Sequence, residues 1–280
     1  MMAPALRTCL WTVLLALTAA PSALAADASP WDGDARASVR LIAGTATPEA
    51  ATLRAGIEVK LKPGWKTYWR YPGDSGVPPR FDFAQSSNVK SVDVLWPMPH
   101  RIADAEGQTI GYKESVIFPL RVERQDTSKP VTLKLKIDYA ICERLCVPAE
   151  GNAELVLAGG PSQLDAVLAA AEASVPKPVA LNQGASFAIR SVRRVTDAGK
   201  PRVIVDVMAP EHFAVDLFAE GPTPEWALPL PMPVPGAPAG DRRFAFALDG
   251  LPPGASADGA MLTLTATAGS EAIEAKARLD

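Results

Sequence analysis

Residues 131–151 read Val-Thr-Leu-Lys-Leu-Lys-Ile-Asp-Tyr-Ala-Ile-Cys-Glu-Arg-Leu-Cys-Val-Pro-Ala-Glu-Gly. Residues 131–140 alternate between apolar and polar side chains, which is the pattern of a β-strand with one buried face. Cys142 and Cys146 follow this strand directly, and Pro148 prevents a helix from continuing beyond them. The stretch therefore predicts a strand that ends in a tight turn carrying two thiols.

The spacing of the two thiols restricts their geometry. A disulfide needs Cα atoms roughly 4.4–6.8 Å apart, whereas four residues of extended strand would separate them by about 13 Å. The backbone between them must therefore turn if the pair closes. Such a pair can staple the turn, bind a soft metal ion or carry electrons. A staple of so small a loop contributes only about 2 kcal/mol, and Arg144 together with free N–H groups in the turn would favour a thiolate.

The rest of the chain predicts an all-β protein. Short alternating segments are separated by turn signals, and 27 prolines favour strand edges and turns over helices. One helix is expected at 162–174, with Ser162 as its N-cap and Leu164, Val167 and Leu168 as its apolar stripe. Pro-rich residues 229–238 suggest an extended edge or loop. Strands are expected at 35–43, 53–61, 65–71, 80–83, 89–96, 116–123, 131–140 and 153–158, and then at 185–195, 201–208, 214–219, 243–248, 261–268 and 272–279.

The N-terminus has the features of a secretory signal peptide. Arg7 precedes a short apolar run at 10–20, and Ala23-Leu24-Ala25 forms a small-x-small cleavage site. Cleavage after Ala25 would remove Cys9 and leave an even pair of cysteines in an oxidising compartment such as the periplasm. The formal net charge of −3 argues against nucleic-acid binding, and no later segment is apolar for long enough to cross a membrane.

A copper site is the main alternative function for the pair. Two thiolates are soft ligands that suit Cu(I), and His100 and Met98 in Trp-Pro-Met-Pro-His could complete a site with Cys142 and Cys146. Such a protein would serve copper tolerance. A third interpretation is a redox-inert binding module in which the pair is a structural disulfide.

Several segments, in the same order, resemble the N-terminal periplasmic domain of the thiol:disulfide interchange protein DsbD and its suppressor-of-copper-sensitivity relatives, ScsB. The similarity covers residues 35–160 and is greater to the ScsB branch. The matching segments are Gly64-Trp-Lys-Thr-Tyr-Trp-Arg70, Pro72-Gly-Asp-Ser-Gly76, Trp96-Pro97, Gly111-Tyr-Lys-Glu-Ser115 and residues 139–148.

The resemblance implies an immunoglobulin-like β-sandwich with a redox pair and no cofactor. In the family, the second cysteine forms the mixed disulfide with partners, which corresponds to Cys146, and the first resolves it, which corresponds to Cys142. A cap loop shields the pair and would correspond to Thr109, Ile110, Gly111 and Tyr112, with Tyr112 as its aromatic residue.

The resemblance also implies partners. A membrane-embedded thiol reductase of the DsbD, CcdA or ScsB type would donate electrons, and it would be a separate protein because the sequence ends at Asp280 without such a module. The acceptors would be exported thioredoxin-like or disulfide-containing proteins, which makes the chain similar to a protein-disulfide reductase. The expected organisation is a signal peptide at 1–25, the redox domain at 26–160, a helix and linker at 161–184 and a second, smaller β-sandwich at 185–280.

Overall fold

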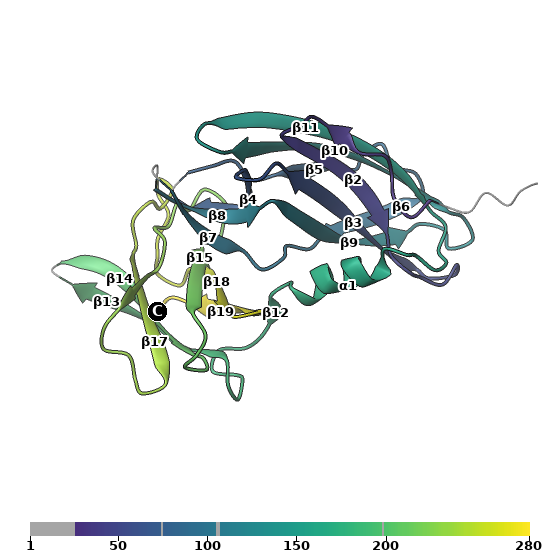
Figure 1. Ribbon diagram of the computed structural model, residues 1–280. Coiled ribbons are helices and arrows are strands. Elements are labelled where there is room, and N and C mark those ends of the chain that lie inside the picture. The colour runs from purple at the N-terminus through teal and green to yellow at the C-terminus, as the bar shows by residue number, and fades with distance from the viewer. Residues whose placement is uncertain (1–25, 74, 105–106, 198) are drawn as a thin grey trace, which may run out of the picture.

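The computed structural model describes residues 26–73, 75–104, 107–197 and 199–280, and the predicted signal peptide lies outside these residues. The described residues form two β-sandwiches and one short helix (Figure 1). The all-β class expected from the sequence is thereby confirmed. None of the helices in the described part has the length and apolar character that crossing a membrane requires.

The first sandwich consists of two antiparallel sheets. One has the strand order β1-β2-β3-β9-β6, and the other has the order β11-β10-β4-β8-β7, with β5 pairing to β10. The strands are β1 (Asp32–Gly33), β2 (Ala37–Ala43), β3 (Thr52–Leu61), β4 (Lys66–Gly73), β5 (Arg80–Asp82), β6 (Val89–Val94), β7 (His100–Asp104), β8 (Gly107–Lys113), β9 (Ser115–Arg124), β10 (Val131–Cys142) and β11 (Cys146–Leu157).

The second sandwich also has two sheets, ordered β12-β19-β18-β15 and β13-β14-β17-β16. Strand β16 lies at a sheet edge within the Pro-rich segment, as the sequence suggested. The strands are β12 (Lys177–Pro178), β13 (Ala188–Asp197), β14 (Lys200–Met208), β15 (Val215–Glu220), β16 (Met232–Val234), β17 (Asp241–Ala247), β18 (Met261–Ala268) and β19 (Glu271–Arg278). Independent folding of the two sandwiches as separate domains stays a prediction.

Alternating side chains place the first core between its two sheets. In β10, Val131, Leu133, Leu135 and Ile137 are buried, while the intervening residues are more exposed. They meet Ile57 and Phe118 from the opposite sheet in one continuous cluster. Each of these strands therefore has a core face and an outer face, and the outer face of the β10 sheet is where the thiols lie.

The helix α1 (Asp165–Ala173) begins later than expected. Ser162 is not its N-cap, because the helix begins at Asp165 and Leu164 stands at the N-cap without a side-chain cap bond. The Ser162 hydroxyl stabilises the preceding turn, since it donates to the carbonyl of Ala43 and accepts from the backbone N–H of Leu164. Of the expected apolar stripe, Leu168 is fully buried, whereas Val167 is exposed. The helix therefore packs through a narrow contact on the first sandwich.

The two sandwiches are joined by aromatic contacts and ion pairs. Phe218 of the second sandwich is fully buried in the first core, where its ring centroid lies 5.8 Å from that of Trp69. Arg70 pairs with Glu220 at 2.7 Å, and Arg101 pairs with Asp216 at the same distance. Strand β4 therefore reaches both the first core and the second sandwich.

Candidate functional site

The two cysteines face each other across a β-hairpin. Strand β10 ends at Cys142, β11 begins at Cys146, and the two residues are direct partners in the antiparallel register. Residues 143–145 form the exposed turn between them. Both thiols are free, and their sulfur atoms lie 2.7 Å apart. The expected turn is therefore confirmed, and it brings the sulfurs close enough to form a disulfide with little movement.

The two sulfurs differ in their exposure. Cys142 is only 2% exposed, whereas Cys146 is exposed to solvent. Strand β11 is an edge strand, which is why it accommodates Pro148 without losing a hydrogen bond to a neighbouring strand. The expectation that Cys142 is the less accessible sulfur is confirmed.

Strand β4 supplies the side chains that contact the pair. Its first residues pair with the end of β10, so that Lys66 lies opposite Cys142. The hydroxyl of Tyr68, two residues further on the same face, lies 2.9 Å from the sulfur of Cys146. Tyr68 is fully buried and packs with Ala140 and Cys142 in a small cluster on the outer face of the sheet.

This environment keeps Cys142 protonated. Burial raises the pKa of the Cys142 thiol to about 11, with a further increase from the contact with Cys146. The Tyr68 hydroxyl and the Lys66 ammonium act in the opposite direction, and Lys66 is therefore the cation that favours the thiolate. Burial also raises the pKa of Tyr68 far above its ordinary value, so this hydroxyl stays protonated and can donate a hydrogen bond to a thiolate.

The four residues expected to form a cap loop lie in strand β8, and the prediction of a loop is wrong. The side chains of Ile110 and Tyr112 are part of the first core, and the Tyr112 hydroxyl donates to the carbonyl of Pro97 at 2.9 Å. Thr109 is buried and accepts a hydrogen bond from Lys66 at 3.1 Å. At Gly111, a Cβ would lie 2.0 Å from the carbonyl oxygen of Thr67, which shows how closely β8 packs on β4.

Residues 75–79, between β4 and β5, lie beside the pair instead. Gly76, at φ +124°, lies so close to the Tyr68 ring that a Cβ there would be 2.3 Å from it. Val77 is 54% exposed and lines a cavity of about 400 Å³ together with Cys146, Val147 and Pro148. Cys146 is therefore open to a partner through a shallow apolar cavity.

The structure does not assemble the alternative copper ligands. His100 is exposed at the start of β7, which is separated from β4 by β8, so its backbone lies about 10 Å from β4. Met98 is half-buried, and its N–H donates to the carbonyl of Ser174. Among the described residues, no group of three or more His, Cys, Asp or Glu is arranged to hold a metal ion.

Sequence reasoning missed Tyr68 and Lys66 as site residues. Both lie in the Trp-rich segment at 64–70, for which the sequence predicted a strand and a family resemblance but no contact with the thiols. Strand alternation places residues 66 and 68 on one face, but their position beside the thiols depends on the pairing of β4 with β10. The sequence therefore shows that Lys66 and Tyr68 share one face of a strand, but it does not show that this strand pairs with the one that carries Cys142.

Comparisons with known proteins agree with this geometry. Residues 39–158 match the family described as thiol:disulfide interchange protein DsbD, N-terminal. The crystal structure of the N-terminal periplasmic domain of ScsB from Proteus mirabilis is similar, with a TM-score of 0.70 and 21% identity over 90% of this chain and 98% of that chain. No curated protein sequence matches the chain. The expected immunoglobulin-like sandwich is thereby confirmed.

Proposed function

We propose that this chain passes electrons through Cys142 and Cys146 to exported proteins, because residues 39–158 match the N-terminal family of the thiol:disulfide interchange protein DsbD. The observation that carries the proposal is the pair itself. One sulfur is exposed, the other is buried, and they lie 2.7 Å apart beside a buried hydroxyl. A structural staple gains nothing from an exposed sulfur.

The exchange follows two balanced steps. The Cys146 thiolate attacks a disulfide of the partner, which forms a mixed disulfide and releases the other partner sulfur as a thiolate. The Cys142 sulfur, after losing its proton, attacks the Cys146 sulfur and releases the second partner thiolate. Two electrons leave the pair, two partner thiolates take up protons, and the chain is left with the Cys142–Cys146 disulfide.

Tyr68 has a positioning role in this proposal. Its buried hydroxyl donates to the Cys146 thiolate and stabilises the attacking form. Cys142 stays protonated while no partner is bound, because burial disfavours its thiolate. The pair therefore presents one nucleophile at a time, which assigns first contact to Cys146 and resolution to Cys142.

Location and partners complete the proposal. The similar ScsB domain is described as periplasmic, and the signal-like residues 1–25 favour export of this chain to the same compartment. We expect a membrane-embedded thiol reductase to return the electrons, and exported thioredoxin-like or disulfide-containing proteins to receive them. The pair needs no cofactor for this chemistry.

Trapping variants test these roles. Cys142→Ser cannot resolve the intermediate, so it should accumulate mixed disulfides with partners through Cys146 when expressed in the periplasm. Cys146→Ser should trap few or none, because its remaining sulfur is 2% exposed. Non-reducing gels with mass spectrometry of the adducts give the measurement.

Two outcomes would count against the proposal. Trapping by Cys146→Ser alone would reverse the roles of the two sulfurs. If neither variant traps a partner and the wild-type disulfide has a reduction potential below about −300 mV, the range of structural disulfides, the pair is a staple.

A further inference from the structure

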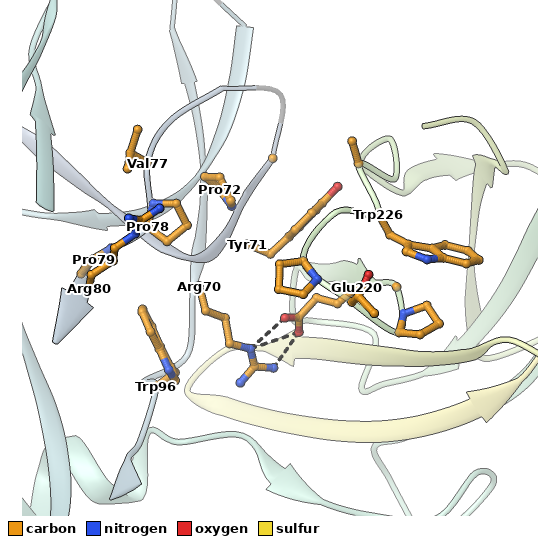
Figure 2. Close-up of a pocket in the computed structure, with 16 residues that line it drawn as sticks. Arg70, Tyr71, Pro72, Val77, Pro78, Pro79, Arg80, Trp96, Glu220 and Trp226 are labelled. Carbon is orange, nitrogen blue, oxygen red and sulfur yellow. Dashed lines mark hydrogen bonds and ion pairs between the residues drawn. The ribbon is translucent and has the colours of Figure 1, made fainter. Parts of the chain in front are cut away.

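A cavity of about 780 Å³ lies between the two sandwiches. Figure 2 shows Val77, Pro78, Arg80 and Trp96 on the wall formed by the first sandwich, with Trp226 on the wall formed by the second. The ion pair between Arg70 and Glu220 closes one side. We call this cavity the inter-sandwich groove.

Aromatic and proline side chains dominate the inter-sandwich groove. Tyr71 projects from the first sandwich toward the wall with Trp226 and donates a hydrogen bond to the carbonyl of Leu228. The second wall adds Pro222 and Pro224, which are exposed. Grooves lined by aromatic rings bind extended, proline-rich segments. Tyr71 and Trp96 are partly exposed to the groove, whereas Trp226 is buried and supports its wall.

The inter-sandwich groove is continuous with the surface of the reactive sulfur. Val77 and Arg80 line both this groove and the cavity that contains Cys146. A chain whose cysteine is bonded to Cys146 can therefore pass over Val77 and enter the groove without leaving the protein surface.

Arg80 gives the route a charge preference. Its side chain is exposed and lies opposite Asp138 in the register of β5 with β10. Asp138 pairs with Lys136 instead, and no hydrogen bond or ion pair of the Arg80 guanidinium occurs among the described residues. Arg70, by contrast, is matched by Glu220 and Glu274. The unmatched charge of Arg80 at the entrance favours a partner with a carboxylate near its cysteine.

We propose that the inter-sandwich groove binds the extended segment that flanks the partner's reactive cysteine, with apolar or proline residues in the groove and an acidic residue at Arg80. The inference rests on the proposed function, since Cys146 must first engage a partner. It assigns the second sandwich the task of forming one wall of the substrate-binding surface.

Synthetic disulfides test the inference. The probes are glutathione disulfide and the disulfide-linked dimers of two peptides, Cys-Ala-Asp-Pro-Leu-Pro-Leu and its reverse, Leu-Pro-Leu-Pro-Asp-Ala-Cys. Oxidation of the reduced full chain is followed by mass spectrometry after alkylation. The two peptides differ only in chain direction, and the one whose direction fits the groove should react faster. That peptide should oxidise the wild-type pair about tenfold faster than glutathione disulfide does, as expected for a docked substrate.

Three variants separate docking from chemistry. Pro222→Arg fills the groove from the second sandwich and should remove the advantage of the peptide while leaving glutathione disulfide unaffected. Arg80→Glu should slow the peptide about tenfold and speed a version with Lys in place of Asp. Lys276→Glu, an equal charge change at an exposed residue of β19 outside the groove, should leave all rates unchanged.

The outcomes distinguish the two proposals. If glutathione disulfide and the peptides all fail to oxidise the wild-type pair, thiol exchange itself is refuted. If they oxidise it but Pro222→Arg and Arg80→Glu react with the peptides as Lys276→Glu does, the groove does not bind the partner and the inference is overturned.

Discussion

Replacing Tyr68 with Phe should lower the reactivity of Cys146 without changing the fold. The substitution removes one hydroxyl, which lies 2.9 Å from the Cys146 sulfur, and keeps the ring that packs against Gly76. The sulfur remains exposed and can be solvated, so no buried polar group is left without a partner. The change therefore isolates the hydrogen bond to the thiolate.

The expected size follows from the difference between charged and neutral hydrogen bonds. A hydrogen bond to a charged group contributes about 1.5–3 kcal/mol, against about 1 kcal/mol for a neutral pair. The loss therefore disfavours the thiolate over the thiol by about 0.5–2 kcal/mol, which is a factor of about 2 to 30 in population. Because Tyr68 is fully buried, we expect about tenfold, in the upper part of this range.

The ultraviolet absorbance of the thiolate measures this population directly. It is recorded at neutral pH in the Cys142→Ser background, with and without Tyr68→Phe. Tyr112→Phe is the matched control, because this buried tyrosine lies in the neighbouring strand but bonds to Pro97 on the core side. Equal thiolate absorbance in the Tyr68 and Tyr112 variants would refute the role of the hydroxyl.

Four further predictions follow from the same geometry. In Cys146→Ser, alkylation of Cys142 should still rise about tenfold per pH unit beyond pH 9, because burial, the largest cause of its raised pKa, remains, and a flat profile would contradict the buried thiol. In the reduced wild-type chain the folded state holds this proton more tightly than the unfolded state, so the free energy of unfolding should fall between about pH 9 and pH 11. Arg70→Met should lower the urea-unfolding free energy by about 1–2 kcal/mol, between the values for exposed and buried ion pairs, and an unchanged value would show that the ion pairs of Arg70 contribute nothing. Gly76→Ala should displace the loop beside the pair and accelerate alkylation of Cys142, and an unchanged rate would mean that the loop does not shield it.

The alternation of apolar and polar side chains predicted the strands that have one buried and one exposed face. It failed for strands that are buried on both faces or exposed along an edge. Residues 109–112 of β8 are all buried, so burial does not alternate along them and no strand was predicted there. The loop expected at these residues came from the family resemblance. The first half of β11 was missed because it is largely exposed, whereas residues 109–112 are buried throughout. It lies at a sheet edge, where Cys146, Pro148 and Glu150 are exposed and the strand pattern is weak.

The cysteines of the site could be predicted from the sequence, whereas their neighbours could not. The spacing required a turn between Cys142 and Cys146 if the pair closes, and the preceding strand together with Pro148 placed that turn at the strand end. The contact with Tyr68 joins residues 78 positions apart and exists only because β4 pairs with β10. A single sequence contains no information on that pairing, so the hydroxyl beside the sulfur was not foreseen.

Strand β4 has consequences for which changes of length the chain can tolerate. Lys66 and Tyr68 face the sulfurs, while Thr67 and Trp69 are buried on the other side of the strand. One inserted or deleted residue in this segment would exchange the two faces, sending a charged side chain into the core and the indole toward the thiols. Related proteins should therefore differ here by substitution and not by length. The exposed turn at 143–145 has no such constraint. The number of residues between the two cysteines is therefore free to vary, whereas the length of β4 is not.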